Sequence, residues 1–270
     1  MIEIKNLSKN FPGRDVLRDL SCRIEDGDTF SVIGPSGTGK STFIKCIMRL
    51  LKPDSGRILV DGEDIAALDD EFEIARIRRN FGYLFQEGAL FDSLTVFENV
   101  SFGLRYLTDI PREDYGRIVA DKLALVGLEK VEHLKPAELS VGMKKRVALA
   151  RAVAAGPKCI LYDEPTTGLD PVTTEMVTDL IVSASEKLKV TSILVTHDVN
   201  LALRISTQVA MLDKGVFAAV EPPDRFVKSE NPAIKEFLEI SNAGHNGCGD
   251  HGGRPGHAGY KGPGGRNGRH

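Results

Sequence analysis

Several features that would assign this sequence to a class at once are missing from its 270 residues. No apolar run approaches the roughly 18 consecutive residues of a membrane-spanning helix, so we expect any membrane role to act through a partner. The opening residues, MIEIKN, lack a basic segment followed by an apolar one, which predicts no secretory signal. The net charge is only −3, so the chain has no overall basic field and we expect no nucleic acid partner. With 41% hydrophobic residues, it is predicted to be globular with a substantial core.

Cysteine is scarce throughout, and apolar residues are scarce near the C-terminus. The four cysteines, Cys22, Cys46, Cys159 and Cys248, lack the spacing of metal ligands and are predicted to be reduced and mostly buried. Residues 241–270 contain eleven glycines and four histidines, and they cannot bury enough surface to offset the entropy of ordering. We therefore predict a disordered tail. Its histidines could gather around Ni²⁺ or Zn²⁺, or the tail could carry no site, and both interpretations stay open.

What the chain does contain is an alternation of strand-like and helix-like segments. Strands are predicted at residues 2–4, 16–24, 29–32, 57–60, 81–85, 158–164, 191–197, 208–212 and 215–220. Helices are predicted at residues 41–51, from residue 171, after residue 197, and at 222–240 with a break near 231–232. Residues 87–155 change to helical periodicity and are predicted to form an inserted helical subdomain. The alternation predicts an α/β fold in which helices pack on a mainly parallel core sheet.

Residues 34–41, GPSGTGKS, match the pattern G-x-x-x-x-G-K-[ST] of a phosphate-binding loop. The match lies where the chemistry requires it, after an apolar strand and before a helix. The glycines let backbone N–H groups point at phosphate oxygens, and the helix N-terminus adds its dipole. Lys40 would supply charge to the β- and γ-phosphates, and Ser41 would ligate Mg²⁺.

Polar residues at the ends of three other predicted strands extend this site. Asp163 and Glu164 end ILYDE, where the first could hold the hydration shell of Mg²⁺ and the second could orient a water for attack on the γ-phosphate. His197 ends SILVTH and could hydrogen-bond a γ-phosphate oxygen. Gln86 ends FGYLFQ and could sense Mg²⁺ and the attacking water. Alone, each is more simply a capping or solvated residue, but the phosphate loop favours the catalytic interpretation.

These elements in this order resemble the ATP-binding cassette (ABC) family over about residues 1–240. FQ at residues 85–86 resembles its Q-loop, LSVGM at 139–143 its signature, ILYDE its Walker B motif, and GLD at 168–170 its D-loop. The resemblance implies a P-loop fold with an antiparallel β edge and an inserted helical subdomain. It also implies that Glu164, His197, Gln86 and Lys40 are catalytic, and that Ser41, Gln86 and Asp163 hold Mg²⁺, the last through water. It assigns ATP to Phe11, which would stack on adenine, and to Val16, Gly34, Pro35, Ser36, Gly37, Thr38, Gly39, Lys40, Ser41, Thr42, Asp163 and the D-loop residue Asp170.

In this family the signature of one chain completes the ATP site of another chain. The resemblance therefore implies that two copies close head to tail around two ATP molecules, with Ser140, Gly142 and Met143 acting in trans. Because Glu164 and His197 are both present, we expect both sites of such a homodimer to be competent.

Residues 86–105, together with Met143 where most cassettes have Gln, are similar to the MlaF-like subfamily that serves lipid transport with MCE-domain proteins. This implies a motor on the cytoplasmic face of the inner membrane that drives phospholipid between inner and outer membranes. Its partners would be a separate permease, an MCE-domain protein and, at residues 222–240, a STAS-domain regulator. An importer ATPase, for example one for amino acids, would share these motifs and stays an alternative. A non-transport ABC protein is less favoured because no second cassette or coiled-coil insertion occurs, and a GTPase because no N-K-x-D segment occurs.

Val141 departs from the signature pattern, where glycine is usual. If Ser140 caps the following helix and Gly142 permits close backbone approach, position 141 needs only a φ below zero, which valine accepts. A β-branched side chain is stiff, so we expect a functional but slower site.

Overall fold

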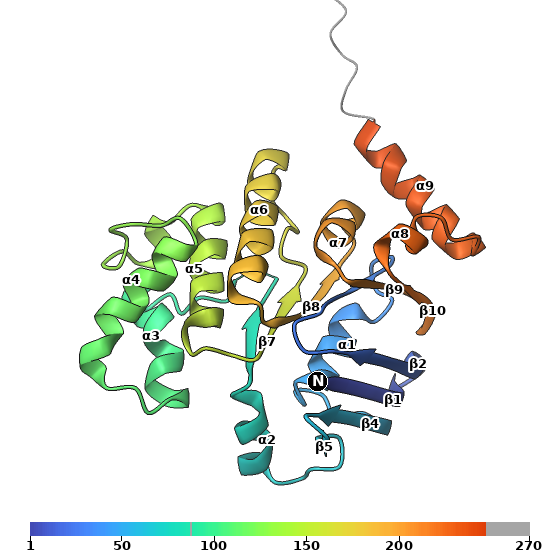
Figure 1. Ribbon diagram of the computed structural model, residues 1–270, viewed down its shortest axis with the longest axis horizontal. Coiled ribbons are helices and arrows are strands. Elements are labelled where there is room, and N and C mark those ends of the chain that lie inside the picture. The colour runs from blue at the N-terminus through green and yellow to red at the C-terminus, as the bar shows by residue number, and fades with distance from the viewer. Residues whose placement is uncertain (87, 247–270) are drawn as a thin grey trace, which may run out of the picture.

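The computed structural model describes residues 1–86 and 88–246, and within them six strands form a central sheet in the order β10-β9-β3-β8-β7-β6 (Figure 1). Neighbouring strands are parallel except at the β9–β10 edge, which is antiparallel. The strands are β3 (Thr29–Ile33), β6 (Phe81–Leu84), β7 (Cys159–Asp163), β8 (Thr191–Thr196), β9 (Gln208–Asp213) and β10 (Val216–Glu221).

A second, antiparallel sheet lies beside the first and has the strand order β2-β1-β4-β5. Its strands are β1 (Ile2–Phe11), β2 (Arg14–Ile24), β4 (Ser55–Val60) and β5 (Glu63–Asp64). The expected α/β fold with a mainly parallel core sheet and an antiparallel β edge is therefore confirmed. The antiparallel part consists mostly of this separate sheet, because only β10 adds an antiparallel strand to the central one.

Strand β7 shows how the central sheet is covered on both faces. Leu161 packs into the cluster formed with the antiparallel sheet and α1 (Lys40–Ile47). Ile160 and Tyr162 point to the opposite face and pack into the cluster formed with the helical subdomain. Side chains alternate along a strand, so a continuous apolar run is what a strand with two buried faces requires.

The inserted helices form a group on one side of the central sheet (Figure 1). They are α3 (Val96–Leu107), α4 (Tyr115–Leu125) and α5 (Val141–Ala154), with 3-10 turns at Arg112–Asp114 and Pro136–Glu138. Helix α3 begins with a capping box, in which Glu98 N–H donates to Thr95 Oγ1 and Thr95 N–H donates to Glu98 Oε2. The remaining helices are α2 (Glu71–Arg78), α6 (Pro171–Leu188), α7 (Val199–Ile205), α8 (Pro223–Phe226) and α9 (Pro232–Asn246).

Two helices in the N-terminal half of the chain, α1 and α2, differ from what the sequence predicts. Helix α1 ends at Ile47 rather than at residue 51, and Arg49 beyond it takes a left-handed φ of 53°. Helix α2 is not predicted by the apolar pattern because half of its residues are charged and only Ile74 and Ile77 are buried. Its start is fixed by a local signal, since the Asp70 side chain accepts from Phe72 N–H.

The C-terminal helix α9 continues to Asn246, six residues into the segment where the composition predicts a tail from residue 241. Ile234 and Phe237 anchor this helix by packing with Phe226 against the sheet. The rest of the predicted tail, including Cys248 and most of the proposed metal-binding histidines, lies outside the described residues.

The cysteine and membrane predictions can be compared with the described residues. Cys46 and Cys159 are buried, Cys22 is half-buried, and all three are free thiols. Burial raises the pKa of Cys22 and of Cys46 to about 12, so these thiols stay protonated at neutral pH. Among the described helices, none is long and apolar enough to cross a membrane.

Candidate active site

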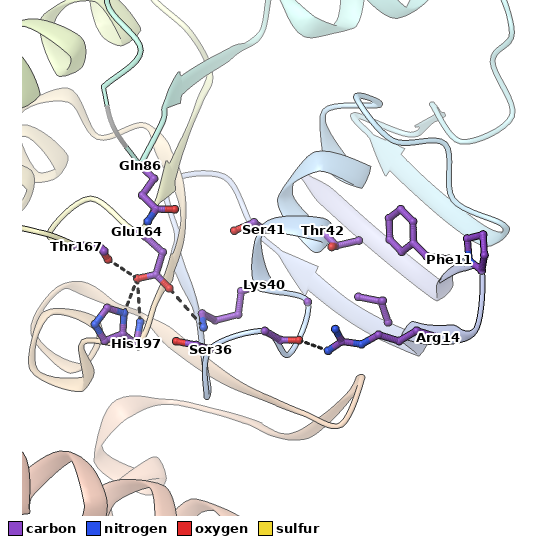
Figure 2. A pocket seen from close by; sticks show the side chains of 14 residues that line it. Phe11, Arg14, Ser36, Lys40, Ser41, Thr42, Gln86, Glu164, Thr167 and His197 are labelled. Atoms are coloured by element: carbon purple, nitrogen blue, oxygen red, sulfur yellow. Dashed lines mark hydrogen bonds and ion pairs between the residues drawn. The ribbon is translucent and has the colours of Figure 1, made fainter.

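The carboxyl ends of four parallel strands meet at one edge of the central sheet. Strand β3 leads into the phosphate loop, β7 ends at Asp163, β8 ends just before His197, and β6 ends two residues before Gln86. A pocket of about 650 Å³ lies at this edge (Figure 2). It is lined by Phe11, Pro12, Arg14, Val16, Ser36, Gly37, Gly39, Lys40, Ser41, Thr42, Gln86, Glu164, Thr167 and His197.

The phosphate loop has a backbone that only glycine allows at two of its positions. Gly34 has φ of 148°, and a Cβ there would lie 2.3 Å from the Leu212 carbonyl oxygen. Gly39 has φ of 108°, and a Cβ there would lie 2.9 Å from the Leu17 side chain. The loop ends at the first turn of α1, so backbone N–H groups and the helix dipole face the pocket together.

Lys40 is buried at the base of this loop, where it already has three oxygen partners. Its Nζ donates to the carbonyl oxygens of Gly34 at 2.9 Å and Pro35 at 3.0 Å. It also forms an ion pair with Glu164 Oε1 at 3.4 Å, drawn in Figure 2. A buried ammonium needs such partners, and phosphate oxygens would be stronger ones because they are charged.

Glu164 is held from the opposite side by His197 and Thr167 (Figure 2). His197 Nδ1 donates to Glu164 Oε2 at 2.7 Å, and Thr167 Oγ1 donates to the same oxygen at 3.1 Å. Glu164 takes a left-handed φ of 48°, which is costly for a residue with a side chain. Strained backbone of this kind clusters at functional sites, and here it directs a buried carboxylate into the pocket wall.

The side-chain oxygens near Glu164 fit a magnesium ion that is bound together with phosphates. Ser41 Oγ donates to Asp163 Oδ1 at 2.7 Å, and Gln86 lines the same pocket. Hydroxyl, carboxylate and amide oxygens are the hard ligands that Mg²⁺ prefers. In residues 1–86 and 88–246, no group of three or more His, Cys, Asp or Glu side chains forms a metal cage. The residues present therefore suit an ion that takes its other ligands from phosphates and water.

Four residues assigned to the nucleotide do not line the pocket but contact residues that do, or that shape its loop. Lys40 Nζ reaches the carbonyl oxygens of Gly34 and Pro35, and Thr38 Oγ1 donates to Pro35 O at 2.9 Å. Asp163 is buried behind Ser41. Phe11 does line the pocket and is 41% exposed, which leaves its ring available to a base.

Pro12, Arg14 and Thr167 also line the pocket, although the motifs do not indicate them. Arg14 Nη2 donates to the Gly37 carbonyl oxygen at 2.5 Å, so a cation from β2 braces the phosphate loop. The local sequence does not predict this contact, because it joins a strand of the antiparallel sheet to the loop that follows β3. Thr167 follows Glu164 by three residues in the sequence. This short separation is the signal by which Thr167 could have been assigned to the site.

The signature and D-loop residues lie away from the pocket lining. Ser140 is the N-cap of α5, with its Oγ accepting from Met143 N–H at 3.3 Å, and Val141 is the first helical residue with its side chain 59% exposed. A Cβ on Gly142 would lie 3.0 Å from Thr173 of α6. Asp170 caps α6 by accepting from the N–H groups of Val172 and Thr173. Ser140, Gly142 and Met143 are thus not brought to the ATP pocket of their own chain.

Comparisons with known proteins agree with this geometry. Residues 17–167 match the family model described as ABC transporter. The chain is 40% identical over 237 residues to the probable ribonucleotide transport ATP-binding protein mkl of Mycobacterium leprae, covering 88% of this chain and 68% of that protein. It is 38% identical over 244 residues to the intermembrane phospholipid transport system ATP-binding protein MlaF of Haemophilus influenzae, covering 90% of this chain and 92% of MlaF.

Two further similarities extend the comparison. Methionine import ATP-binding protein MetN 2 of Pseudomonas entomophila is 39% identical over 244 residues, covering 88% of this chain and 72% of that protein. The dimeric post-hydrolysis structure of the ATP-binding cassette MJ0796 bound to ADP and Pi superposes with a TM-score of 0.75 at 33% identity, covering 83% of this chain and 99% of that one.

The parallel sheet, the phosphate loop and the family match define an ATPase of the P-loop class. More narrowly, the chain belongs to the ABC transporter family, as an ATP-binding subunit that hydrolyses ATP.

Proposed function

We propose that this ATPase is the motor subunit of a transporter that moves phospholipid between the inner and outer membranes. The observation that carries the proposal is the similarity to MlaF, a protein named for intermembrane phospholipid transport. This similarity extends over 92% of the length of MlaF. The mkl and MetN relatives are as similar per residue but align over 68% and 72% of their own lengths. Residues 86–105 and Met143 support the same subfamily.

The residues of the pocket support distinct roles in ATP hydrolysis. The loop amides and Lys40 bind the β- and γ-phosphates, and the phosphates draw Lys40 away from Glu164. Ser41 and Gln86, with Asp163 acting through water, would hold Mg²⁺, and the ion would neutralise charge on the phosphate oxygens. Glu164 then orients the attacking water, and His197 donates toward the γ-phosphate once its bond to Glu164 opens. Phe11 and Val16 take the adenine at the open end of the pocket.

We infer that a second copy of the chain completes the site head to tail. The signature residues Ser140 and Val141 lie at an exposed helix start outside the pocket lining, so their own chain does not use them there. Helix N-termini bind anions, and the start of α5 is free to meet the γ-phosphate held by a partner. The dimeric cassette structure with 33% identity supports this arrangement.

An apolar groove supports docking of a membrane-embedded permease, which would place the ATPase at the inner face of the inner membrane. The groove has a volume of about 380 Å³ and runs beside the segment after β6. The ring centroids of Phe91 and Phe102 lie 4.7 Å apart in its wall, and the Tyr106 ring lies 4.7 Å from Phe102 at the edge of the groove, tilted by 47°. Exposed aromatic residues gathered in one groove indicate a protein contact. We propose that a permease helix occupies it.

Two cations of the signature helix α5, the half-buried Arg151 and the buried Lys145, contact the segment beside the groove, which supports communication between the permease and the ATP site. Arg151 donates to the carbonyl oxygens of Gly88 and Ala89, both at 2.8 Å, and its guanidinium lies 5.7 Å from the Phe91 ring. Burial lowers the pKa of Arg151. Lys145 of the same helix donates to the Gln86 carbonyl oxygen. A shift of α5 would therefore move the Q-loop.

An MCE-domain protein and a STAS-domain regulator complete the proposed assembly. The surface proposed for the regulator is formed by α8 and α9, where Val227 and Ile240 are exposed. The competing function is import of an amino acid, favoured by the similarity to MetN 2.

The test is purification of the intact complex from native membranes, with its subunits identified by mass spectrometry and its activity measured in liposomes. We expect a permease with an MCE-domain protein, and ATP-dependent transfer of a fluorescent phospholipid between vesicles. ATP hydrolysis stimulated by an amino acid, with no lipid transfer, would support the importer instead.

A further inference from the structure

Tyr83 links the edge strand of the central sheet to the Walker B carboxylate. It lies on β6, which pairs in parallel with β7, so that Tyr83 and Asp163 project from the same face. The Tyr83 hydroxyl donates to Asp163 Oδ2 at 2.8 Å, and this hydrogen bond is buried. The ring packs on Phe85 with the centroids 4.2 Å apart. The residue thus has an anchored ring and a hydroxyl aimed at one oxygen.

The two oxygens of Asp163 have different partners. Oδ1 accepts from Ser41 Oγ at 2.7 Å, whereas Oδ2 accepts from the Tyr83 hydroxyl. If Ser41 turns its oxygen lone pair to Mg²⁺, Oδ1 becomes available to a metal-bound water. Tyr83 is then the partner that still fixes the carboxylate plane.

The Tyr83 hydroxyl is suited to a constant donor role. A phenol has one proton to donate, and the buried geometry gives it Asp163 Oδ2 as the acceptor. Packing alone would be served by phenylalanine, and a buried hydroxyl is costly unless it has a partner.

We propose that Tyr83 is a positioning residue for the magnesium site, holding the Asp163 carboxylate in the orientation that binds the hydrated ion. This inference rests on the proposed role of Asp163 and Ser41 in metal binding. Partners that orient a metal-binding group typically change metal affinity by about 10- to 100-fold when removed.

Tyr83→Phe tests the proposal, because it keeps the ring and removes the hydroxyl. Tyr162→Phe is the matched control: it removes a buried hydroxyl from the neighbouring strand β7, on the opposite face from Asp163. Binding of a non-hydrolysable ATP analogue is measured by calorimetry across a Mg²⁺ titration and again in EDTA. Bound Mn²⁺ is counted by electron paramagnetic resonance in the presence of the analogue.

We expect Tyr83→Phe to require about tenfold more Mg²⁺ or Mn²⁺ for half-saturation, while its analogue affinity in EDTA stays at the wild-type value. Tyr162→Phe should match wild type in both. A metal requirement of Tyr83→Phe within twofold of wild type would overturn the positioning role. If the phenylalanine variant does not fold, Tyr83→Met gives the same comparison. Wild-type binding that does not respond to either metal would instead contradict the proposed metal site itself.

Discussion

The chain carries ATPase motifs in two regions that are built differently. At the edge of the central sheet, Lys40, Asp163 and Glu164 are buried, and each contacts several partners within its own chain. At the start of α5, Ser140 is held by a local N-cap bond and Val141 is 59% exposed. The first region is preorganised by the fold, whereas the second presents a helix start to its surroundings. The difference supports the proposal that one chain supplies halves of two different ATP sites.

The largest effect is expected in the buried region, from Lys40→Ala. The substitution leaves Glu164 without its cation and removes the charge proposed for the phosphates. ATP affinity should fall by roughly one to two orders of magnitude, since a hydrogen bond to a charged group contributes about 1.5–3 kcal/mol. Hydrolysis should fall to background. Calorimetry and phosphate release measure both, and Lys52→Ala, which removes an exposed lysine paired with Asp69, is the control. Unchanged ATP affinity would show that the buried region is not the phosphate site.

A smaller effect is expected in the exposed region, from Ser140→Ala. Loss of the N-cap should destabilise the chain by about 1 kcal/mol and also slow hydrolysis, because the hydroxyl is proposed to contact the partner's ATP. Thr95→Ala removes the cap of α3 instead and controls for stability alone. Urea unfolding and steady-state turnover separate the two effects. Equal turnover in the two variants would argue against a role for Ser140 beyond capping.

Val141→Gly should change turnover less. Val141 is helical and does not have a positive φ, so its backbone is one that valine accepts, as the sequence predicts. Relief of the stiff side chain should raise turnover by roughly two- to threefold, which corresponds to less than 1 kcal/mol of barrier. A gain of tenfold or more would show that the signature is impaired as it stands. A loss would show that the exposed valine makes a favourable contact in the dimer.

The smallest effect concerns pH and the D-loop. Hydrogen bonds from the Thr173 side chain and backbone hold the pKa of Asp170 below its usual value of 3.8. Because the pKa of Asp170 is lower in the folded state than in the unfolded state, its charged form stabilises the fold. This contribution is fully present above pH 3.8 and is lost as the pH falls through the pKa of the folded state. Asp170→Asn retains a capping oxygen but does not titrate. Its melting temperature should therefore fall slightly less than that of wild type between pH 6 and pH 3, and equal falls would contradict the assignment.

The sequence predicted the parts of this molecule that depend on local pattern. Apolar runs marked the central strands, and the polar residues that end them, such as Asp163 and His197, fall at the same sheet edge because the strands are parallel. The phosphate loop was predictable because its glycines and Lys40 follow a fixed spacing.

The parts that were missed depend on charge or on tertiary contact. Helix α2 has too few apolar residues to show periodicity, so its Asp70 cap was the better signal. The contact of Arg14 with Gly37 joins strand β2 to the phosphate loop, and the hydrogen bond of Tyr83 to Asp163 joins two strands far apart in the sequence. Such contacts follow from the packing of elements, which local pattern does not specify.

The central claim is that two chains share each ATP site, and Glu164→Gln tests it most directly. Glutamine keeps the shape of the side chain but cannot act as a base, so hydrolysis should fall by at least about 100-fold while ATP stays bound. Light scattering of this variant with and without ATP should show that ATP converts the monomer to a dimer. A monomeric mass at saturating ATP, or turnover near the wild-type rate, would contradict the account.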